Sequence, residues 1–152
     1  MSQPLFLLFW AGVITLKITA VAEQTLIVMI QLDANYLILG SIASTSPGAD
    51  LRRWITQGEA TSTSAIAWME FVTGPVQPEV VESVRHILED RIVSIGRDEA
   101  ELAASLFNLV GRKRALRYDC IIAATAIRTG ARLATTDRSD FALFVPHGLE
   151  LA

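Results

Sequence analysis

The chain has 152 residues, 51% of them hydrophobic and 19% charged, which predicts one compact domain with a buried core and excludes a disordered chain. Its formal net charge of −3 does not by itself suggest a nucleic-acid binder. If several carboxylates bind cations, however, the net charge of the rest of the chain is slightly positive. A substrate that carries phosphate groups is therefore not excluded. Cys120 is the only cysteine, which excludes an intrachain disulfide and leaves no cysteine–histidine cluster for zinc, and a cytoplasmic location is expected.

Residues 1–28 form a hydrophobic N-terminal extension. The length of its apolar run, Leu5–Leu16, fits a buried helix or the core of a signal peptide better than a membrane span, so no stable membrane insertion is expected. The sequence at 20–22 resembles a signal cleavage site, but the first cation, Lys17, follows the apolar run instead of preceding it. Three interpretations stay open: a mis-assigned start with Met29 as the true first residue, an additional helix, or a signal or anchor segment.

The first elements of the main domain alternate between strand and helix. Residues 26–33 are β-branched and continuously apolar, which predicts a central parallel strand covered on both faces and ended by Asp33. A short helix is expected over 34–42. After a turn, Asp50 is predicted to cap a helix over 51–58.

The rest of the chain continues the alternation. A helix over 64–75 has Ser62 or Ser64 near its start, and a helix over 97–114 has acids in its first turn and cations in its last, which suits the helix dipole. A helix rich in small residues opens at Asp119 and ends at Gly130. The other expected elements are strands over 59–63, 91–96, 131–136 and 148–152, a helix over 78–90, and a turn or short helix over 137–144. This order predicts an α/β fold with a mostly parallel sheet.

Several acidic side chains are placed where such a fold binds ligands, at the carboxyl ends of its strands. Asp33 and Asp137 each end a strand, and Glu70 lies in a helix that follows one. Asp119 opens the helix rich in small residues, and Asp140 follows Asp137 by one turn. Taken singly, Asp33 and Asp119 are equally well read as helix caps and Asp137 as a turn residue. Taken together in this order, they predict one cluster of carboxylates.

Carboxylates held close together in a partly dry cleft repel one another and need a compensating cation. Oxygen ligands without Cys or His suit Mg²⁺ or Mn²⁺ better than zinc. Such a site performs in-line attack of metal-activated water on a phosphodiester.

A basic segment precedes the helix that carries Asp119. It fits a rim that steers phosphate groups, or equally the favourable cations at a helix C-terminus. Its candidate RNA-binding residues are Arg112, Lys113, Arg114 and Arg117.

The stretches "LDANYLI", "SAIAWMEF" and "RYDCIIAATAI", with "LATTDRSDF" after them, resemble the PIN-domain nucleases, especially toxin ribonucleases of the VapC type. The resemblance covers residues 29–152 and implies a PIN-like three-layer α/β/α fold with a mostly parallel central sheet. It further implies a Mg²⁺- or Mn²⁺-dependent endoribonuclease that acts on structured RNA such as transfer or ribosomal RNA. A homodimer restrained by a small cognate antitoxin is implied as well.

The resemblance also assigns roles residue by residue. It implies a catalytic quartet and an auxiliary fifth acid, Asp140, which joins three of the quartet as metal ligands. Asn35 would hold the first carboxylate, while Ser64 and Thr136 would orient carboxylates or water. The quartet is Asp33, Glu70, Asp119 and Asp137, and the metal ligands are Asp33, Asp119, Asp137 and Asp140.

Two departures from the family pattern and three other functions bear on this assignment. Ala34 stands where a hydroxyl residue is common, and most members lack the hydrophobic extension. A phosphatase of the haloacid-dehalogenase type would need an aspartate where Asn35 stands, and a nucleotide-binding Rossmann domain would need a glycine-rich turn after the first strand. A catalytically silent PIN-like module that binds RNA or protein remains the main alternative.

Overall fold

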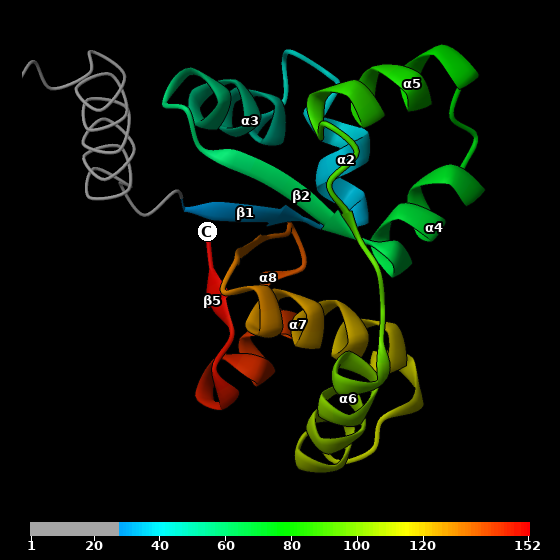
Figure 1. Ribbon diagram of the computed structural model, residues 1–152, viewed down its shortest axis with the longest axis vertical. Coiled ribbons are helices and arrows are strands. Elements are labelled where there is room, and N and C mark those ends of the chain that lie inside the picture. Colours follow the sequence, from blue (N-terminus) through cyan, green and yellow to red (C-terminus); the bar gives the residue numbers. More distant parts are fainter. Residues whose placement is uncertain (1–27) are drawn as a thin grey trace, which may run out of the picture.

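The computed structural model describes residues 28–152, and the expectations for residues 1–27 lie outside the described part (Figure 1). No helix in the described part is long and apolar enough to cross a membrane. Five strands form one sheet in the order β3-β2-β1-β4-β5, and every neighbouring pair is parallel. The strands are β1 (Met29–Leu32), β2 (Ala60–Ser64), β3 (Ile92–Val93), β4 (Arg132–Ala134) and β5 (Glu150–Leu151).

Helices cover both faces of this sheet, which confirms the predicted three-layer α/β/α fold. In Figure 1, α2, α3 and α5 lie on one side of the strands, and α6 and α7 lie on the other. The helices are α2 (Ala34–Gly40), α3 (Ser46–Thr56), α4 (Ala65–Thr73), α5 (Pro78–Ile87), α6 (Arg97–Leu109), α7 (Arg117–Thr129) and α8 (Arg138–Phe141), with the 3-10 helices η1 (Arg114–Leu116) and η2 (Ala142–His147).

Two hydrophobic cores follow from the pleat of the central strand, because successive side chains of a strand point to opposite faces. Ile30 and Leu32 of β1 enter the core under α2, α3 and α5. Gln31, between them, points the other way, and its Nε2 donates to the carbonyl of Ile122 in α7 at 2.9 Å. Leu133, the β4 partner of Gln31, belongs to the core under α6 and α7. The apolar side chains of β1 therefore pack into the first core, while Gln31 faces the second layer with its Nε2 bonded and its buried Oε1 without a partner among the described residues.

The strand order places a topological switch point in the middle of the sheet. The chain leaves β1 toward β2 and β3 and later returns to β4 and β5 on the other side of β1. In open parallel sheets, ligands bind at the carboxyl ends of the strands where the order reverses. The ends of β1 and β4 are therefore the place to look for a functional site.

The predicted start of α3 is wrong. The helix begins at Ser46, where Thr45 is the N-cap and its Oγ1 accepts from the Gly48 N–H at 3.0 Å. A Cβ at Gly48 would meet the Ile42 carbonyl oxygen at 2.2 Å, so this apparent turn sequence is a tightly packed first helical turn. Asp50 lies inside the helix, where its carboxylate accepts from the Tyr36 hydroxyl at 2.9 Å.

The boundaries around the basic segment also differ from the prediction. Helix α6 ends at Leu109, and no basic residue stands in its last turn. Gly111 and Arg112 adopt positive φ angles of 84° and 58° and turn the chain away before the remaining cations. Helix α7 begins at Arg117, so Asp119 lies in its first turn and is not its cap.

Candidate functional site

The first acid is fixed at the end of the central strand. Asp33 follows β1, is only 4% exposed, and caps α2 by accepting from the Ala34 N–H at 2.8 Å. Its backbone N–H donates to the carbonyl of Ala134 in β4 at 3.0 Å. Its other carboxylate oxygen accepts from the Thr135 hydroxyl at 2.8 Å and from Asn35 Nδ2 at 3.0 Å. The carboxylate is therefore held from three sides before any ligand binds.

Asn35 joins this acid to the one that follows β4. Its Nδ2 lies 3.0 Å from Asp33 Oδ2 and 3.2 Å from Asp137 Oδ2. Its Oδ1 accepts from the Thr136 N–H at 3.1 Å. The predicted contact between Asn35 and the first carboxylate is present, and the same amide also restrains the second.

Thr135 is a site residue that the sequence analysis missed. Its hydroxyl donates to Asp33 and accepts from the Asp137 N–H at 3.0 Å, whereas Thr136 contributes its backbone N–H and has an exposed side chain. The strand pattern contains a usable signal. Thr135 follows Leu133 by two positions, and Leu133 pairs in register with Gln31, which precedes Asp33 by two, so both polar side chains share one face.

All four acids of the predicted quartet line one pocket of about 630 Å³. Glu70 comes from α4 and Asp119 from the first turn of α7, and together they face the ends of β1 and β4. Apolar side chains form part of the rim. The lining residues are Asp33, Ala34, Asn35, Ile38, Met69, Glu70, Thr73, Gly74, Tyr118, Asp119 and Asp137.

The electrostatics of this pocket show mutual repulsion. Burial, followed by the charges of Asp33, Asp140 and Asp137, raises the pKa of Asp119 to about 6. Burial also raises the pKa of Glu70, and Asp33 and Asp119 raise it further. Burial is the largest influence on Asp33, whose pKa is raised despite its hydrogen bonds.

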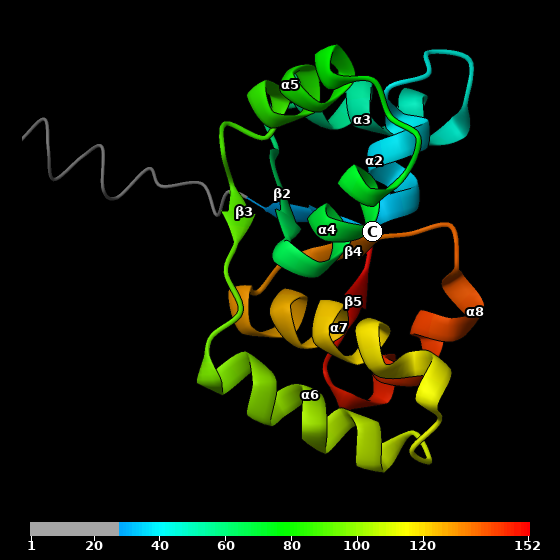
Figure 2. The same cartoon turned by 90° about the vertical axis from the view of Figure 1, so that its right-hand side faces the viewer.

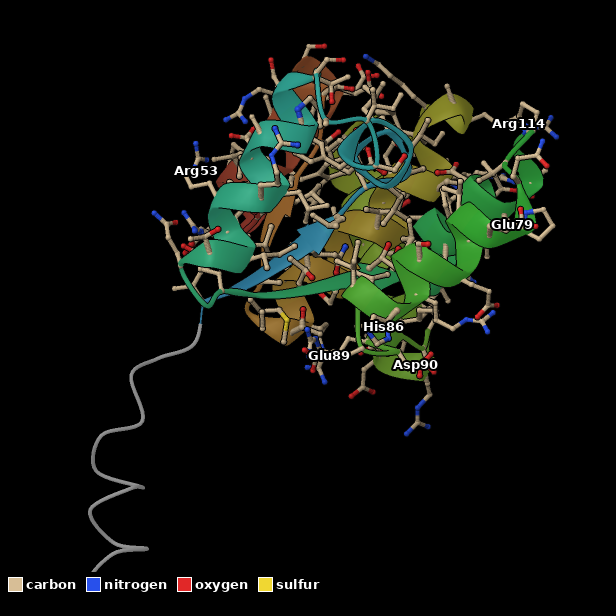
Figure 3. All side chains as sticks on the ribbon, turned by 90° about the horizontal axis from the view of Figure 1, so that it is seen from above. Arg53, Glu79, His86, Glu89, Asp90 and Arg114 are labelled. Carbon is tan, nitrogen blue, oxygen red and sulfur yellow. The ribbon has the colours of Figure 1, made fainter. Side chains whose placement is uncertain are left out.

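The lack of counter-charge separates this pocket from other acidic surfaces. Within residues 28–152 no ion pair includes any of the quartet. A hollow of similar size, about 620 Å³, lies around His86, Glu89 and Asp90 (Figure 3), but there Arg91 pairs with Glu89 at 2.7 Å. The acids at the switch point of the sheet are therefore gathered in one pocket without an ionic partner.

Asp140 and Ser64, like Thr136, lie outside the pocket lining. Asp140, in α8, donates its backbone N–H to the Asp137 carbonyl at 3.1 Å and affects the site through its charge on Asp119. Ser64 is buried and caps α4 by accepting from the Ala67 N–H at 3.1 Å. In the described structure Ser64 forms no hydrogen bond with the quartet and starts the helix that carries Glu70, so its role in orienting carboxylates or water stays a prediction.

The basic segment does not form part of the acidic pocket. Its four cations are exposed, and in Figure 3 Arg114 lies at the outer edge of the molecule. The Arg117 guanidinium lies 5.7 Å from the ring centroid of Phe107, on the side of α6. None of Arg112, Lys113, Arg114 and Arg117 lines the pocket itself, and their role in binding RNA stays a prediction.

The donor set fits a hard divalent cation that keeps part of its water shell. The acidic ligands offer only oxygen, as Mg²⁺ and Mn²⁺ prefer. Across residues 28–152 no three acidic, cysteine or histidine side chains stand close enough to form a complete metal site. Mg²⁺ needs only one or two carboxylates when water and substrate phosphate complete its shell. Asp33 and Asp137, joined by Asn35, are the best-prepared pair for it.

Sequence comparison identifies the family. The PIN domain family matches residues 30–143, so the chain belongs to the PIN domain family, as predicted. PIN domains are generally nucleases. A search of curated proteins found no match of significance.

Solved structures agree with this family. A toxin–antitoxin complex from Klebsiella pneumoniae is similar with a TM-score of 0.60 and 28% identity, over 74% of this chain and 90% of that chain. FitAcB from Neisseria gonorrhoeae has a TM-score of 0.62 and 21% identity, over 82% and 97% of the two chains. VapBC2 from Rickettsia felis, bound to a promoter DNA fragment, has a TM-score of 0.60 and 17% identity, over 82% and 97%. The last two show the shared fold alone.

Proposed function

We propose that the protein is a Mg²⁺- or Mn²⁺-dependent endoribonuclease and the toxin of a toxin–antitoxin pair. The observation that carries the proposal is the pocket at the ends of β1 and β4, where four carboxylates without ionic partners meet. Repulsion among them is relieved when a divalent cation binds. A site that had lost its activity would have no reason to keep neighbouring carboxylates whose charges raise the pKa values of Asp119 and Glu70, which argues against a silent binding module.

Each residue of the pocket has a role in this proposal. Asp33 and Asp137 hold the cation directly, and Asp119 completes its shell either directly or through one of its waters, with Asp140 as an auxiliary acid. When bound, the cation supplies an activated water for in-line attack on a phosphodiester and neutralises developing charge. Asn35 and Thr135 keep the Asp33 carboxylate in place. Glu70, whose pKa burial raises, is suited to take the proton that the attacking water loses.

The proposed partners follow from the family and its neighbours. The Klebsiella complex supports a small cognate antitoxin as the protein partner. Structured RNA, such as transfer or ribosomal RNA, is the proposed substrate, and a homodimer is the proposed assembly. A genomic neighbour that encodes a small protein binding this chain tightly would support the toxin assignment.

The direct test is cleavage of a transfer-RNA and ribosomal-RNA pool by the full chain with Mg²⁺, with Mn²⁺ and with EDTA. We expect new RNA ends only with a divalent cation. An Asp137→Asn variant purified in the same way is the control for contaminating ribonuclease, which would cut equally in both preparations. RNA that is bound but never cut would overturn the nuclease and favour the silent module.

Replacing Asn35 by alanine is expected to weaken Mn²⁺ binding by about 10- to 100-fold, because partners that orient metal ligands contribute that much to affinity. The substitution removes hydrogen bonds to both Asp33 and Asp137. Calorimetric titration with Mn²⁺ measures the effect. Asn108→Ala, an exposed change of the same chemistry in α6, is the matched control. Equal affinities in the two variants would contradict the bridging role of Asn35.

A further inference from the structure

A second, apolar hollow adjoins the acidic pocket. It has a volume of about 280 Å³ and lies between α6 and α7, which run side by side in Figure 2. Its walls are almost entirely apolar, with one cation and two aromatic rings. The lining residues are Ile95, Ala100, Ala103, Ala104, Phe107, Arg117, Tyr118, Cys120 and Ile121.

Tyr118 connects the two hollows. Its side chain lines both of them, and it directly precedes Asp119 in the first turn of α7. It is 52% exposed, so much of this aromatic side chain is accessible to a ligand. Within residues 28–152 it is the only aromatic residue among the exposed large hydrophobic side chains. A group stacked on Tyr118 would therefore sit next to the acids.

The charge at the rim indicates which group this is. Arg117 lies against Phe107 at 5.7 Å from the ring centroid, and within the described residues no acidic side chain pairs with it. Aromatic faces beside a free guanidinium are the features that hold unpaired bases and their phosphates. A docked protein helix would need a groove with anchors over successive turns. A hollow of about 280 Å³ is suited to one flat group.

We propose that this hollow is a base-binding subsite for an unpaired nucleotide adjacent to the phosphate that is cut. The base stacks on Tyr118 and enters the hollow toward Phe107, while Arg117 contacts the neighbouring phosphate. The substrate is then RNA that is single-stranded at the cut, in a loop or an unpaired segment, because a base inside a duplex cannot reach the hollow. This inference rests on the proposed nuclease site, because the subsite positions the RNA relative to Asp119.

The first experiment detects binding of a base at the subsite and needs no RNA cleavage. Short single-stranded RNAs of one sequence, each carrying the fluorescent base 2-aminopurine at a different position, are mixed with the full-length Asp119→Asn variant in EDTA. We expect quenching at one or two adjacent positions, retained in Asp119→Asn/Tyr118→Phe and lost in Asp119→Asn/Tyr118→Ala. Uniform quenching, no quenching, or quenching unaffected by Tyr118→Ala would overturn the subsite.

The second experiment uses cleavage and separates this inference from the proposed function. Tyr118→Ala should lower kcat/KM on a loop substrate by about 5- to 150-fold, the value of one stacked base, and Tyr118→Phe should restore most of it. An abasic nucleotide at the stacked position should produce the same loss in the wild type and no further loss in Tyr118→Ala. Leu143→Ala, at an exposed position in η2, is the control for surface truncation.

The outcomes distinguish the possible failures. If the wild type cuts no RNA but the quenching pattern is present, the nuclease proposal fails and the subsite stands. If the wild type cuts RNA but the losses in kcat/KM from Tyr118→Ala and from the abasic nucleotide are additive, the subsite is wrong and the nuclease proposal stands. If Tyr118→Ala lowers only the affinity for the antitoxin, the hollow binds protein and the inference is wrong.

Discussion

Replacing Asp119 by asparagine is expected to lower the rate of metal-dependent RNA cleavage by roughly 10³-fold or more, because a metal ligand contributes several kcal/mol to the transition state. The same substitution is expected to raise the free energy of unfolding at neutral pH in EDTA. Loss of function together with a gain of stability is characteristic of a charged residue that is needed for activity but destabilises the folded state.

The gain in stability follows from the pKa of Asp119, which burial and the neighbouring acids raise from 3.8 to about 6. Between these values the folded chain holds a proton that the unfolded chain has released, so the stability of the wild type falls as pH rises through this window. Above this pH window the charged Asp119 carboxylate destabilises the folded state by its full amount. For a half-exposed carboxylate screened by solvent, that penalty is about 1–2 kcal/mol.

Urea unfolding of both proteins across this pH range measures the effect, with cleavage assays on the same preparations. The difference in stability should be small near pH 4 and should grow until about pH 6. Asp98→Asn, at an exposed acid in α6 that pairs with Arg128 at 2.9 Å, should leave cleavage unchanged. An Asp119→Asn variant that is inactive but less stable at neutral pH would contradict the electrostatic explanation.

Mn²⁺ or Mg²⁺ is expected to stabilise the wild type by about 2.7 kcal/mol when the free cation is 100 times its dissociation constant. The stabilisation should weaken below about pH 6, where Asp119 takes up a proton and competes with the cation. Glu70 and Asp33 should act in the same direction, since their pKa values are raised as well.

Thermal unfolding with increasing Mn²⁺ provides the measurement, and it needs no RNA substrate. Asp33→Asn should abolish most of the shift in Tm, because Asp33 is the most firmly held acid of the pocket. Glu101→Gln changes an exposed acid of α6 and should retain the shift. An equal shift in both variants would mean that the cation binds elsewhere.

The sequence by itself determined the order of the elements and the place of the principal acids. The β-branched, apolar run before Asp33 is typical of a strand covered on both faces, and Gly130 ends α7 in the left-handed conformation that glycine adopts without strain. Carboxyl ends of parallel strands lie at one edge of a sheet, so Asp33 and Asp137 had to be neighbours once the alternation was recognised.

Only the tertiary structure decided which polar residues support those acids. The choice of Thr135 over Thr136 depends on the register between β1 and β4, which joins residues about a hundred positions apart. The position of the basic segment outside the pocket lining depends on how α6 and α7 pack, which places Arg117 against Phe107 of α6. The hollow beside Tyr118 exists because α6 packs against α7. Side-chain type is local information, but the neighbours of a side chain are set by how distant segments meet.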